Sequence, residues 1–543
     1  MTAQVQSSPS ASGPTSMSHA EILESMSGLM LSMFVAMLSS TVVSNALPRI
    51  LHDLHGGESA YTWVVTATLL ATTAATPLWG KLADLTSKKL LMQLAICIFI
   101  AGSLVAGLSQ SIGMLIGCRV VQGVGAGGIL AMTQVIMAAM VSPRERGRYS
   151  GYLGATFAVA TIAGPLIGGV IVDTSWLGWR WCFYVGVPFA AAALVVLQKT
   201  LHLPVVRREI SIDYLGAGLI VGGVSVLLVW VSLAGQQFDW ISGTTAGLVA
   251  LGVVLLALAT VVELRASEPI IPLQLFRHRT VSLATAAGLF LGVAMFGATI
   301  FLAQYFQISR GESPTVSGLR TMPMILGLAI SSLVVGRLVT KTGKWKRYLV
   351  TGAASATLGF ALLSTIDADT SFVLLAVYMA LIGIGLGMTM QNLVLSVQNT
   401  VPGQQLGAAT ATVSFFRSLG GAIGVSALGA VLGARVKEHI TSGLAHLGGG
   451  SGALEGSGST IPDVNTLPPQ VARIVEQAYG QAIGHTFLLA APLVLLALIM
   501  ILFIREVPLR QQSGTELAGD LEVGGAAGQV SGQPVEHVAQ TQR

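Results

Sequence analysis

The feature that most constrains this chain is a series of apolar stretches, each roughly twenty residues long and nearly free of charge. About twenty helical residues cover the roughly 30 Å hydrocarbon core of a bilayer. Within that core a backbone must satisfy its own hydrogen bonds, which favours helices. Only 10% of the residues are charged, against about 25% in soluble domains. The sequence therefore predicts an all-α polytopic membrane protein.

The apolar stretches predict fourteen membrane-spanning helices separated by polar breaks. The predicted limits are residues 25–48, 60–80, 90–109, 112–141, 149–172, 181–198, 214–235, 243–262, 280–306, 319–336, 348–366, 372–398, 406–434 and 484–504. Twenty of the 29 Lys and Arg residues lie in loops after even-numbered helices or in the C-terminal tail, and seven lie in the other loops. Because cytoplasmic loops carry the excess of basic residues, both termini are expected in the cytoplasm.

Two similar segments indicate an internal repeat. After the second predicted helix comes GKLADLTSKK (residues 80–89), and after the tenth comes GRLVTKTGKWKR (residues 336–347). The two copies are eight helices apart rather than six. We therefore expect two six-helix bundles with two further helices, the seventh and eighth, inserted between them. Paired repeats around a central cleft are typical of transporters, with the substrate near the bilayer midplane.

The domain organisation follows from these limits. The N-terminal six-helix bundle covers residues 25–198, the cytoplasmic linkers and inserted helices cover 199–279, and the C-terminal bundle covers 280–504. A long extracellular loop, 434–483, includes a glycine- and serine-rich stretch that is expected to be flexible. The polar segments 1–24 and 505–543 are both expected to be disordered in the cytoplasm.

Several function classes find no support in the sequence. The net charge of +5 is spread over the loops, without the dense basic patch of a nucleic-acid-binding protein. The three cysteines lie in or beside apolar stretches and indicate neither a disulfide framework nor a metal site. The segment TGKWK (342–346) lacks the spacing and the hydroxyl of a phosphate-binding loop. We expect no enzyme, no cofactor and no metal, and an ion gradient as the energy source.

Four motifs resemble those of the major facilitator superfamily and occur in the same order. In residues 80–89, Asp84 matches the acidic position of the loop motif G-x-L-a-D-r-x-G-r-r, whereas Leu85 and Ser87 replace its Arg and Gly. The other matches are LIGCRVVQGVGAGG (115–128) in the fourth helix, AGPLIGG (163–169) in the fifth helix, and GESPTVSGLRTMP (311–323) before the tenth. The last two resemble antiporters, and the whole pattern resembles the fourteen-span drug:proton antiporter family.

The resemblance implies gating or coupling roles for residues of these motifs. Asp84 is expected to pair across the bundle in one conformation and to release in the other; the alternative is a surface ion pair of little consequence. Arg119 lies inside the fourth helix, where inserting a cation into the membrane costs about 2.5–3.5 kcal/mol. Its presence there implies a role in proton or conformational coupling, and the alternative is an Arg whose hydrogen bonds are satisfied by helix carbonyls. The expected set is Asp84, Arg119, Gln122, Gly164, Pro165, Gly168, Gly169, Asp173 and Arg417.

Two helices of this set carry small residues on one face. Ala160, Gly164 and Gly168 recur every four residues in the fifth helix, so a neighbouring helix can approach closely there. This contact is interpreted as a gating contact, the alternative being a static helix crossing. In the thirteenth helix, Arg417 lies beside further glycines. Arg417 is expected to attract an anionic group or to balance a carboxylate, and the alternative is a structural capping role.

The first helix departs from the resembled family. In LSSTVVSNALP (38–48), Ser39 occupies the usual acidic position, and no acidic residue of the chain lies near the middle of a predicted helix. The usual mid-membrane proton carrier is therefore missing. Asp84 and Asp173 are the candidate substitutes, together with His485 at the outer start of the fourteenth helix.

Uncharged polar and aromatic side chains of the spans are candidate substrate contacts. They are Thr41, Asn45, Gln304, Tyr305, Gln391, Asn392, Phe415 and Phe416. Each is equally open to a role in helix–helix hydrogen bonds or core packing. A mostly apolar cavity would suit amphipathic or lipophilic compounds.

The resemblance implies the major facilitator fold and a secondary active multidrug or antibiotic exporter of the bacterial inner membrane, working by drug:H⁺ antiport and alternating access. Its expected partners are a small amphipathic substrate, protons and membrane lipids. Two alternatives remain open. In the first, the protein has the same fold but exports lipids or cell-envelope intermediates. In the second, it is a membrane sensor or scaffold that does not transport.

Overall fold

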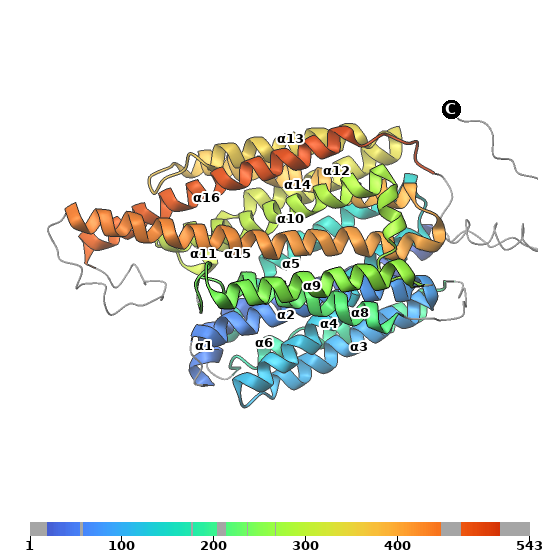
Figure 1. Cartoon of the computed structure of the whole chain (residues 1–543), viewed down its shortest axis with the longest axis horizontal. Helices are drawn as coiled ribbons and strands as arrows, with labels where there is room; N and C mark the ends of the chain where they lie inside the picture. Colours follow the sequence, from blue (N-terminus) through green and yellow to red (C-terminus); the bar gives the residue numbers. More distant parts are fainter. Residues whose placement is uncertain are drawn as a thin grey trace, which may run out of the picture.

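The structure is a computed structural model of the chain, and it describes residues 19–54, 58–174, 177–203, 213–235, 237–266, 268–446 and 468–510. These residues form helices that run side by side along the long axis of the molecule (Figure 1). Within these ranges the only β-type pairing is an isolated bridge between Ala234 and Phe238, and no strand forms. The predicted all-α class is confirmed.

The helices fall into three sets along the chain. The first is α1 (His19–Asp53), α2 (Glu58–Leu85), α3 (Lys88–Gly107), α4 (Ile112–Met140), α5 (Pro143–Asp173), α6 (Trp181–Tyr184) and α7 (Val187–Thr200). The second is α8 (Tyr214–Leu233) and α9 (Gly243–Arg265). The third is η1 (Leu273–Arg277), α10 (Arg279–Gln304), the π-helical η2 (Tyr305–Ser309), α11 (Pro314–Arg320), α12 (Met322–Thr342), α13 (Lys346–Leu363), α14 (Phe372–Thr400), η3 (Gly403–Gln405), α15 (Leu406–His446) and α16 (Pro469–Phe503).

Twelve helical segments in the described ranges are long and apolar enough to cross a membrane, so the predicted count of fourteen is not confirmed. The two predicted spans outside this set are also helical. They correspond to α2, which is rich in threonine, and to α13, which begins with Lys346 and Arg347. α2 packs against α4, and α13 packs against α14 while side chains such as Leu358 stay exposed on its outer face.

Separate apolar cores divide the long helices into two groups. Buried side chains such as Met26, Phe99 and Met132 form a core within α1–α7, here called the N-terminal group. Others such as Leu291 and Phe360 form a larger core within α10–α16, the C-terminal group. Since each core is built from one part of the chain, each group has its own hydrophobic driving force.

The inserted helices contact both groups. Ile220 and Val224 of α8 pack against Leu70 of α2 and against Phe415 of α15 in a separate apolar cluster. In Figure 1, α9 accordingly lies between α15 and α2. The pair α8–α9 therefore spans the line along which α2 and α15 meet.

The two ends of the bundle differ. We call the end that carries the repeated segments 80–89 and 336–347 the motif end, and the opposite one the far end. At the far end α15 and α16 extend beyond their neighbours, on the left in Figure 1. The loop predicted over residues 434–483 is thus helical as far as His446 and again from Pro469. Residues 447–467 lie outside the described ranges. Of the segments predicted to be disordered, 1–24 and 505–543, the parts 1–18 and 511–543 also lie outside them, whereas residues 19–24 form the start of α1.

Candidate functional site

The N- and C-terminal groups meet at the motif end through a pair of glycine crossings. At the first, α2 crosses α15, and a Cβ atom on Gly80 would lie 2.8 Å from the carbonyl oxygen of Gly407. At the second, α5 crosses α12, and a Cβ on Gly147 would lie 2.5 Å from the carbonyl oxygen of Gly336. Gly80 and Gly336 begin the two repeated segments. The repeat therefore places one close backbone contact on each side of the bundle.

Asp84 lies four residues beyond the first crossing and bonds to the start of α15. Its Oδ1 accepts a hydrogen bond of 2.8 Å from the backbone N–H of Gly407, and its Oδ2 accepts one of 2.8 Å from that of Ala408. Free N–H groups and the helix dipole make this terminus favourable for a carboxylate. Asp84 thus joins the two groups through backbone donors. The nearby Lys81 pairs instead with Glu268, which follows the inserted helices.

Arg146 forms a further bridge that the sequence analysis missed, because it was counted as a loop cation. Its side chain is buried and donates 2.9 Å hydrogen bonds to the carbonyl oxygens of Ala138 and Val141. It also donates to Gln398 of α14, whose amide donates to Thr410 of α15 over 2.9 Å. One signal was present: Arg146 directly precedes Gly147, within the first turn of a helix that begins with proline.

A third polar bridge and an apolar hollow lie deeper in the bundle. The Gln134 amide of α4 donates to the Gln391 oxygen of α14 over 3.2 Å, and so joins the two groups. The hollow has walls from both groups. Its lining residues are Phe157 and Thr161 of α5, Met295 and Thr299 of α10, Met324, Ile325 and Leu328 of α12, and Leu386 of α14. The two methionines of this lining have flexible side chains, which adapt to ligands of different shape.

The comparisons with known proteins agree with this architecture. The sequence profile described as Major Facilitator Superfamily matches residues 29–425. The chain belongs to the major facilitator superfamily. Among its relatives, the multidrug transporter protein MdtP of Bacillus subtilis (strain 168) is 34% identical, over 83% of this chain and 80% of its own length. The efflux pump dotC of Dothistroma septosporum is 33% identical, over 89% of this chain and 84% of its own length.

Solved structures show the same fold. The proton:xylose symporter XylE aligns with a TM-score of 0.57 at 13% identity, covering 92% of this chain and 98% of its own. The major facilitator fold predicted from the motifs is confirmed. Membership of this superfamily also makes the chain a membrane transporter rather than an enzyme.

Ser39, which stands where the superfamily resemblance places an acidic residue, belongs to a buried polar cluster without a carboxylate. The Gln122 amide donates to Ser39 over 2.9 Å and to Ser103 over 2.8 Å. Arg119 is only 2% exposed and donates to the Gln122 oxygen over 2.5 Å, while its Nε has no partner among the described residues. The predicted residues Arg119 and Gln122 are thus brought together with Ser39.

The glycines of the fifth-helix motif have different surroundings. Gly164 packs against α1, since a Cβ there would collide with the side chain of Thr41. Thr41 itself donates to the carbonyl oxygen of Leu38 over 3.0 Å, so its hydroxyl is already used. Gly168 is buried. A Cβ atom on Gly169 would lie 4.0 Å from the hydroxyl oxygen of Thr315, which belongs to the C-terminal group. The side chains of three further predicted residues lie outside those described, namely Asn45, Pro165 and Asp173.

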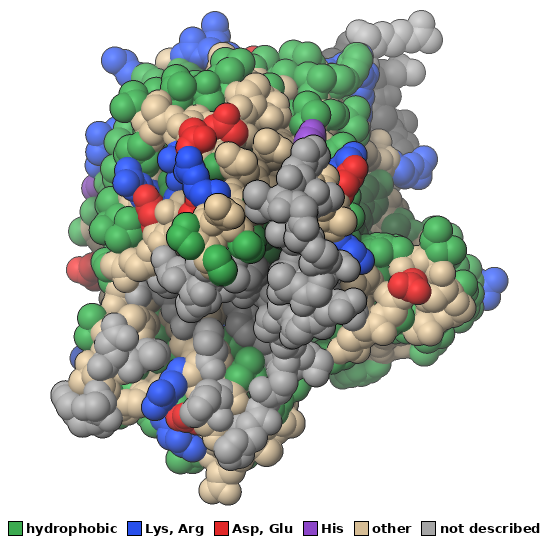
Figure 2. Space-filling model, turned by 90° about the vertical axis from the view of Figure 1, so that its left-hand side faces the viewer, with side chains coloured by type: hydrophobic (Ala, Val, Ile, Leu, Met, Phe, Trp, Pro, Cys, Tyr) green, Lys and Arg blue, Asp and Glu red, His purple; other side chains and the backbone are tan. Residues whose placement is uncertain are grey.

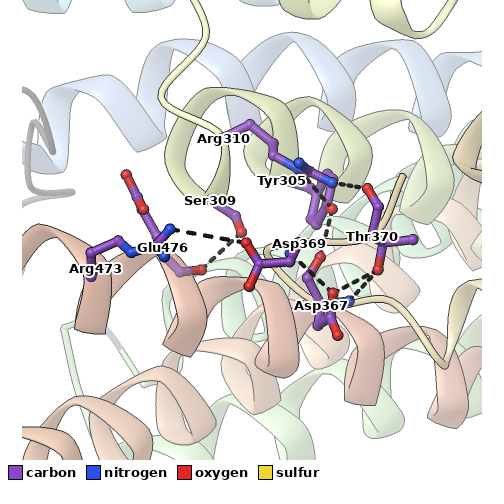
Figure 3. A network of polar contacts seen from close by, with 8 residues as sticks. All are labelled: Tyr305, Ser309, Arg310, Asp367, Asp369, Thr370, Arg473 and Glu476. Atoms are coloured by element: carbon purple, nitrogen blue, oxygen red, sulfur yellow. Dashed lines mark hydrogen bonds and ion pairs between the residues drawn. The ribbon is translucent and has the colours of Figure 1, made fainter. Parts of the chain in front are cut away.

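A polar network at the far end includes Tyr305, one of the predicted substrate residues (Figure 3). The Tyr305 hydroxyl donates to the carbonyl oxygen of Asp367 over 2.7 Å and accepts from Arg310 over 3.0 Å. Ser309 donates to the carbonyl oxygen of Glu476 in α16 over 2.8 Å. Tyr305 is fully buried and ties η2 to the loop between α13 and α14. Charged side chains gather at this end (Figure 2).

The remaining substrate candidates lie in packing contacts. Phe415 and Phe416 fill the space between α15, α2 and α8, with Phe416 also 6.1 Å from the ring of Phe276. The Asn392 amide donates to a carbonyl of its own helix over 2.7 Å. Gln304 is half-buried, and its Oε1 has no partner in the described part of the chain. His485, predicted as a candidate proton carrier rather than a substrate contact, stacks on His439 with the ring centres 6.0 Å apart, between α15 and α16.

Proposed function

We propose that this transporter exports small amphipathic or lipophilic compounds by drug:proton antiport, through alternating access between the N- and C-terminal groups. The names of MdtP and dotC, a multidrug transporter and an efflux pump, support this substrate class. The observation that carries the proposal is the pair of glycine crossings with Asp84 bound to the start of α15. These contacts close one end of the bundle without covalent links, as a reversible gate requires.

In this conformation the motif end is closed. Gly80, Asp84 and Arg146 all make their contacts between the groups at this end. The hollow lies farther along, because Met295 is in the second half of α10 and Met324 is at the start of α12. With the motif end in the cytoplasm, as the loop charges predict, the cytoplasmic side is closed in this state. Opening both crossings and closing the far end would expose the hollow to the cytoplasm.

Asp84 is proposed to couple this movement to protons. As a carboxylate it accepts two hydrogen bonds at the positive end of α15. Protonation of one oxygen would remove the charge and weaken both bonds, because charge-assisted hydrogen bonds are roughly twice as strong as neutral ones. The closed motif end would then open more easily. The Ser39–Gln122–Arg119 cluster holds no carboxylate, which leaves Asp84 as the described carboxylate that joins the two groups.

The test uses purified protein in proteoliposomes with an imposed pH gradient and a panel of fluorescent amphipathic compounds. Gradient-dependent movement of at least one compound is expected, together with its loss in Asp84→Asn. Asp369→Asn is the matched control, because Asp369 is exposed at the far end. A fluorescent phospholipid in the same vesicles tests the lipid-export alternative. Gradient-independent behaviour of every compound would refute antiport.

A further inference from the structure

We propose that Arg417 is the anion-recognising residue of the substrate site, so that the compounds carried include amphipathic acids. This inference rests on the proposed function, since it names a substrate class for the same central site. Arg417 lies eleven residues into α15, or roughly 16 Å along the helix axis. This depth places its cation well inside the bundle.

The backbone around Arg417 is fixed by close packing. A Cβ on Gly292 of α10 would collide with the carbonyl oxygen of Arg417, and one on Gly420 would lie 2.9 Å from Cα of Leu289. The α15 backbone therefore rests directly on α10 at this level. The guanidinium extends toward α14, where its Nη1 lies 3.9 Å from the Met390 sulfur.

Comparison with the other two interior arginines shows what Arg417 lacks. Arg146 donates to two carbonyl oxygens and to an amide oxygen. Arg119 donates to the Gln122 oxygen. Within the described ranges, Arg417 has neither an oxygen acceptor nor a carboxylate, and a thioether sulfur is a weak acceptor. A guanidinium in a membrane interior without such a partner is characteristic of a residue that binds one from outside the chain.

The surroundings of Arg417 fit an anion with an apolar body. Leu386, in the wall of the hollow, lies one helical turn before Met390 on the same face of α14. Met295, in the opposite wall, follows Gly292 by three residues in α10. The hollow thus begins about one turn from the guanidinium on two helices. Arg417 is half-buried rather than sealed, so a ligand can reach it.

The division of roles follows from this geometry. The hollow has a volume of only about 20 Å³ in this conformation, so the apolar part of a ligand would enter it as the two groups separate and enlarge it. The acidic group of the ligand would accept hydrogen bonds from the Arg417 guanidinium, whose planar fork matches a carboxylate. Gln391, adjacent to Met390 in sequence, now bonds to Gln134. Separation of the two groups would free the Gln391 oxygen, which could then accept a hydrogen bond from the same ligand.

The experiment compares three ligands that share one fluorophore. Dansylglycine carries a carboxylate, dansylamide is neutral, and monodansylcadaverine carries an ammonium. Binding to the full chain in lipid nanodiscs is followed by dansyl fluorescence. Dansylglycine is expected to bind about tenfold more tightly than dansylamide, as a charge-assisted pair predicts. Arg417→Gln should remove that preference and leave dansylamide binding unchanged.

Two variants keep the test decisive. Arg417→Lys retains the charge and should retain most of the preference, even if Arg417→Gln yields little folded protein. Arg435→Gln is the matched control, because Arg435 lies exposed on the same helix and pairs with Glu438. Equal binding of the three ligands, preference for the ammonium, or an unchanged preference in folded Arg417→Gln would each overturn the inference.

Failure of this inference is distinguishable from failure of the proposed function. Gradient-driven movement of monodansylcadaverine, with dansylglycine binding that does not depend on Arg417, would keep the exporter and refute the anion site. Absence of gradient-driven movement for all three ligands, with dansylglycine binding that requires Arg417, would refute antiport and keep the anion site.

Discussion

Replacing Gly147 by alanine tests the closed motif end most directly. The added Cβ would lie 2.5 Å from the carbonyl oxygen of Gly336, whereas ordinary contacts begin at 3.4 Å. The α5 and α12 backbones must therefore separate by about 0.9 Å, since the Cβ is fixed to one helix backbone and the oxygen that it meets belongs to the other. Overpacking of this kind costs about 1–3 kcal/mol, which would shift the ratio of closed to open states roughly five- to 150-fold.

Spin labels report this shift. Arg144 and Lys341 are exposed at the motif end, on α5 and α12, and are suitable labelling sites once the three cysteines are replaced by serine. Gly147→Ala is expected to lengthen the distance between the labels and to raise the population of the open state. The control is Gly117→Ala, because a Cβ on Gly117 meets nothing within 4 Å. An unchanged distance distribution in folded Gly147→Ala would show that this crossing does not set the closed state.

Three further substitutions address the polar contacts of the motif end. Asp84→Asn keeps the shape of the side chain and loses its charge; it should destabilise the closed state by about 1 kcal/mol, seen as greater thiol accessibility at the motif end. Arg146→Met should lower thermal stability by about 3 kcal/mol or more by leaving Gln398 and two carbonyls unpaired, measured by fluorescence-detected thermal unfolding. Lys81→Met should cost about 1 kcal/mol or less at the Glu268 contact, because Glu268 is 38% exposed, and should leave transport largely intact in the proteoliposome assay.

The sequence was sufficient for the features that depend on local pattern. Apolar length predicts the helices because the bilayer sets one required dimension. The repeat predicts the paired crossings, since Gly80 and Gly336 begin corresponding segments and each contacts a helix of the other group. The predicted count of fourteen spans is not confirmed, because the threonine-rich α2 and α13, which begins with two cations, lie outside the twelve segments that are long and apolar enough to cross a membrane.

Residue roles that depend on distant partners were not predictable. Arg146 appears in sequence as one of several loop cations, and only folding brings Gln398 to it from 252 positions away. Tyr305 looks like a ligand contact until the loop at Asp367 takes its hydroxyl. Phe415 and Phe416 are aromatic residues of a predicted span, yet the inserted α8 covers them. In each case the deciding contact lies on another helix, which periodicity cannot identify.

The inserted helices make the two sides of the bundle unequal, and this predicts an unequal movement. The apolar cluster of α8 includes residues of α2 and α15 and none of α5 or α12, and Lys81 adds an ion pair to the segment after α9. Separation of α2 from α15 must therefore expose apolar surface on α8, at about 25 cal/mol per Å² where water enters, whereas α5 and α12 carry no such brace in that cluster. We expect the α5–α12 crossing to open farther than the α2–α15 crossing when transport is driven. Label pairs on each side, Arg144 with Lys341 and Lys88 with Gln404, measure both movements in one protein. Equal opening on the two sides would show that α8 and α9 move with one group and brace neither crossing.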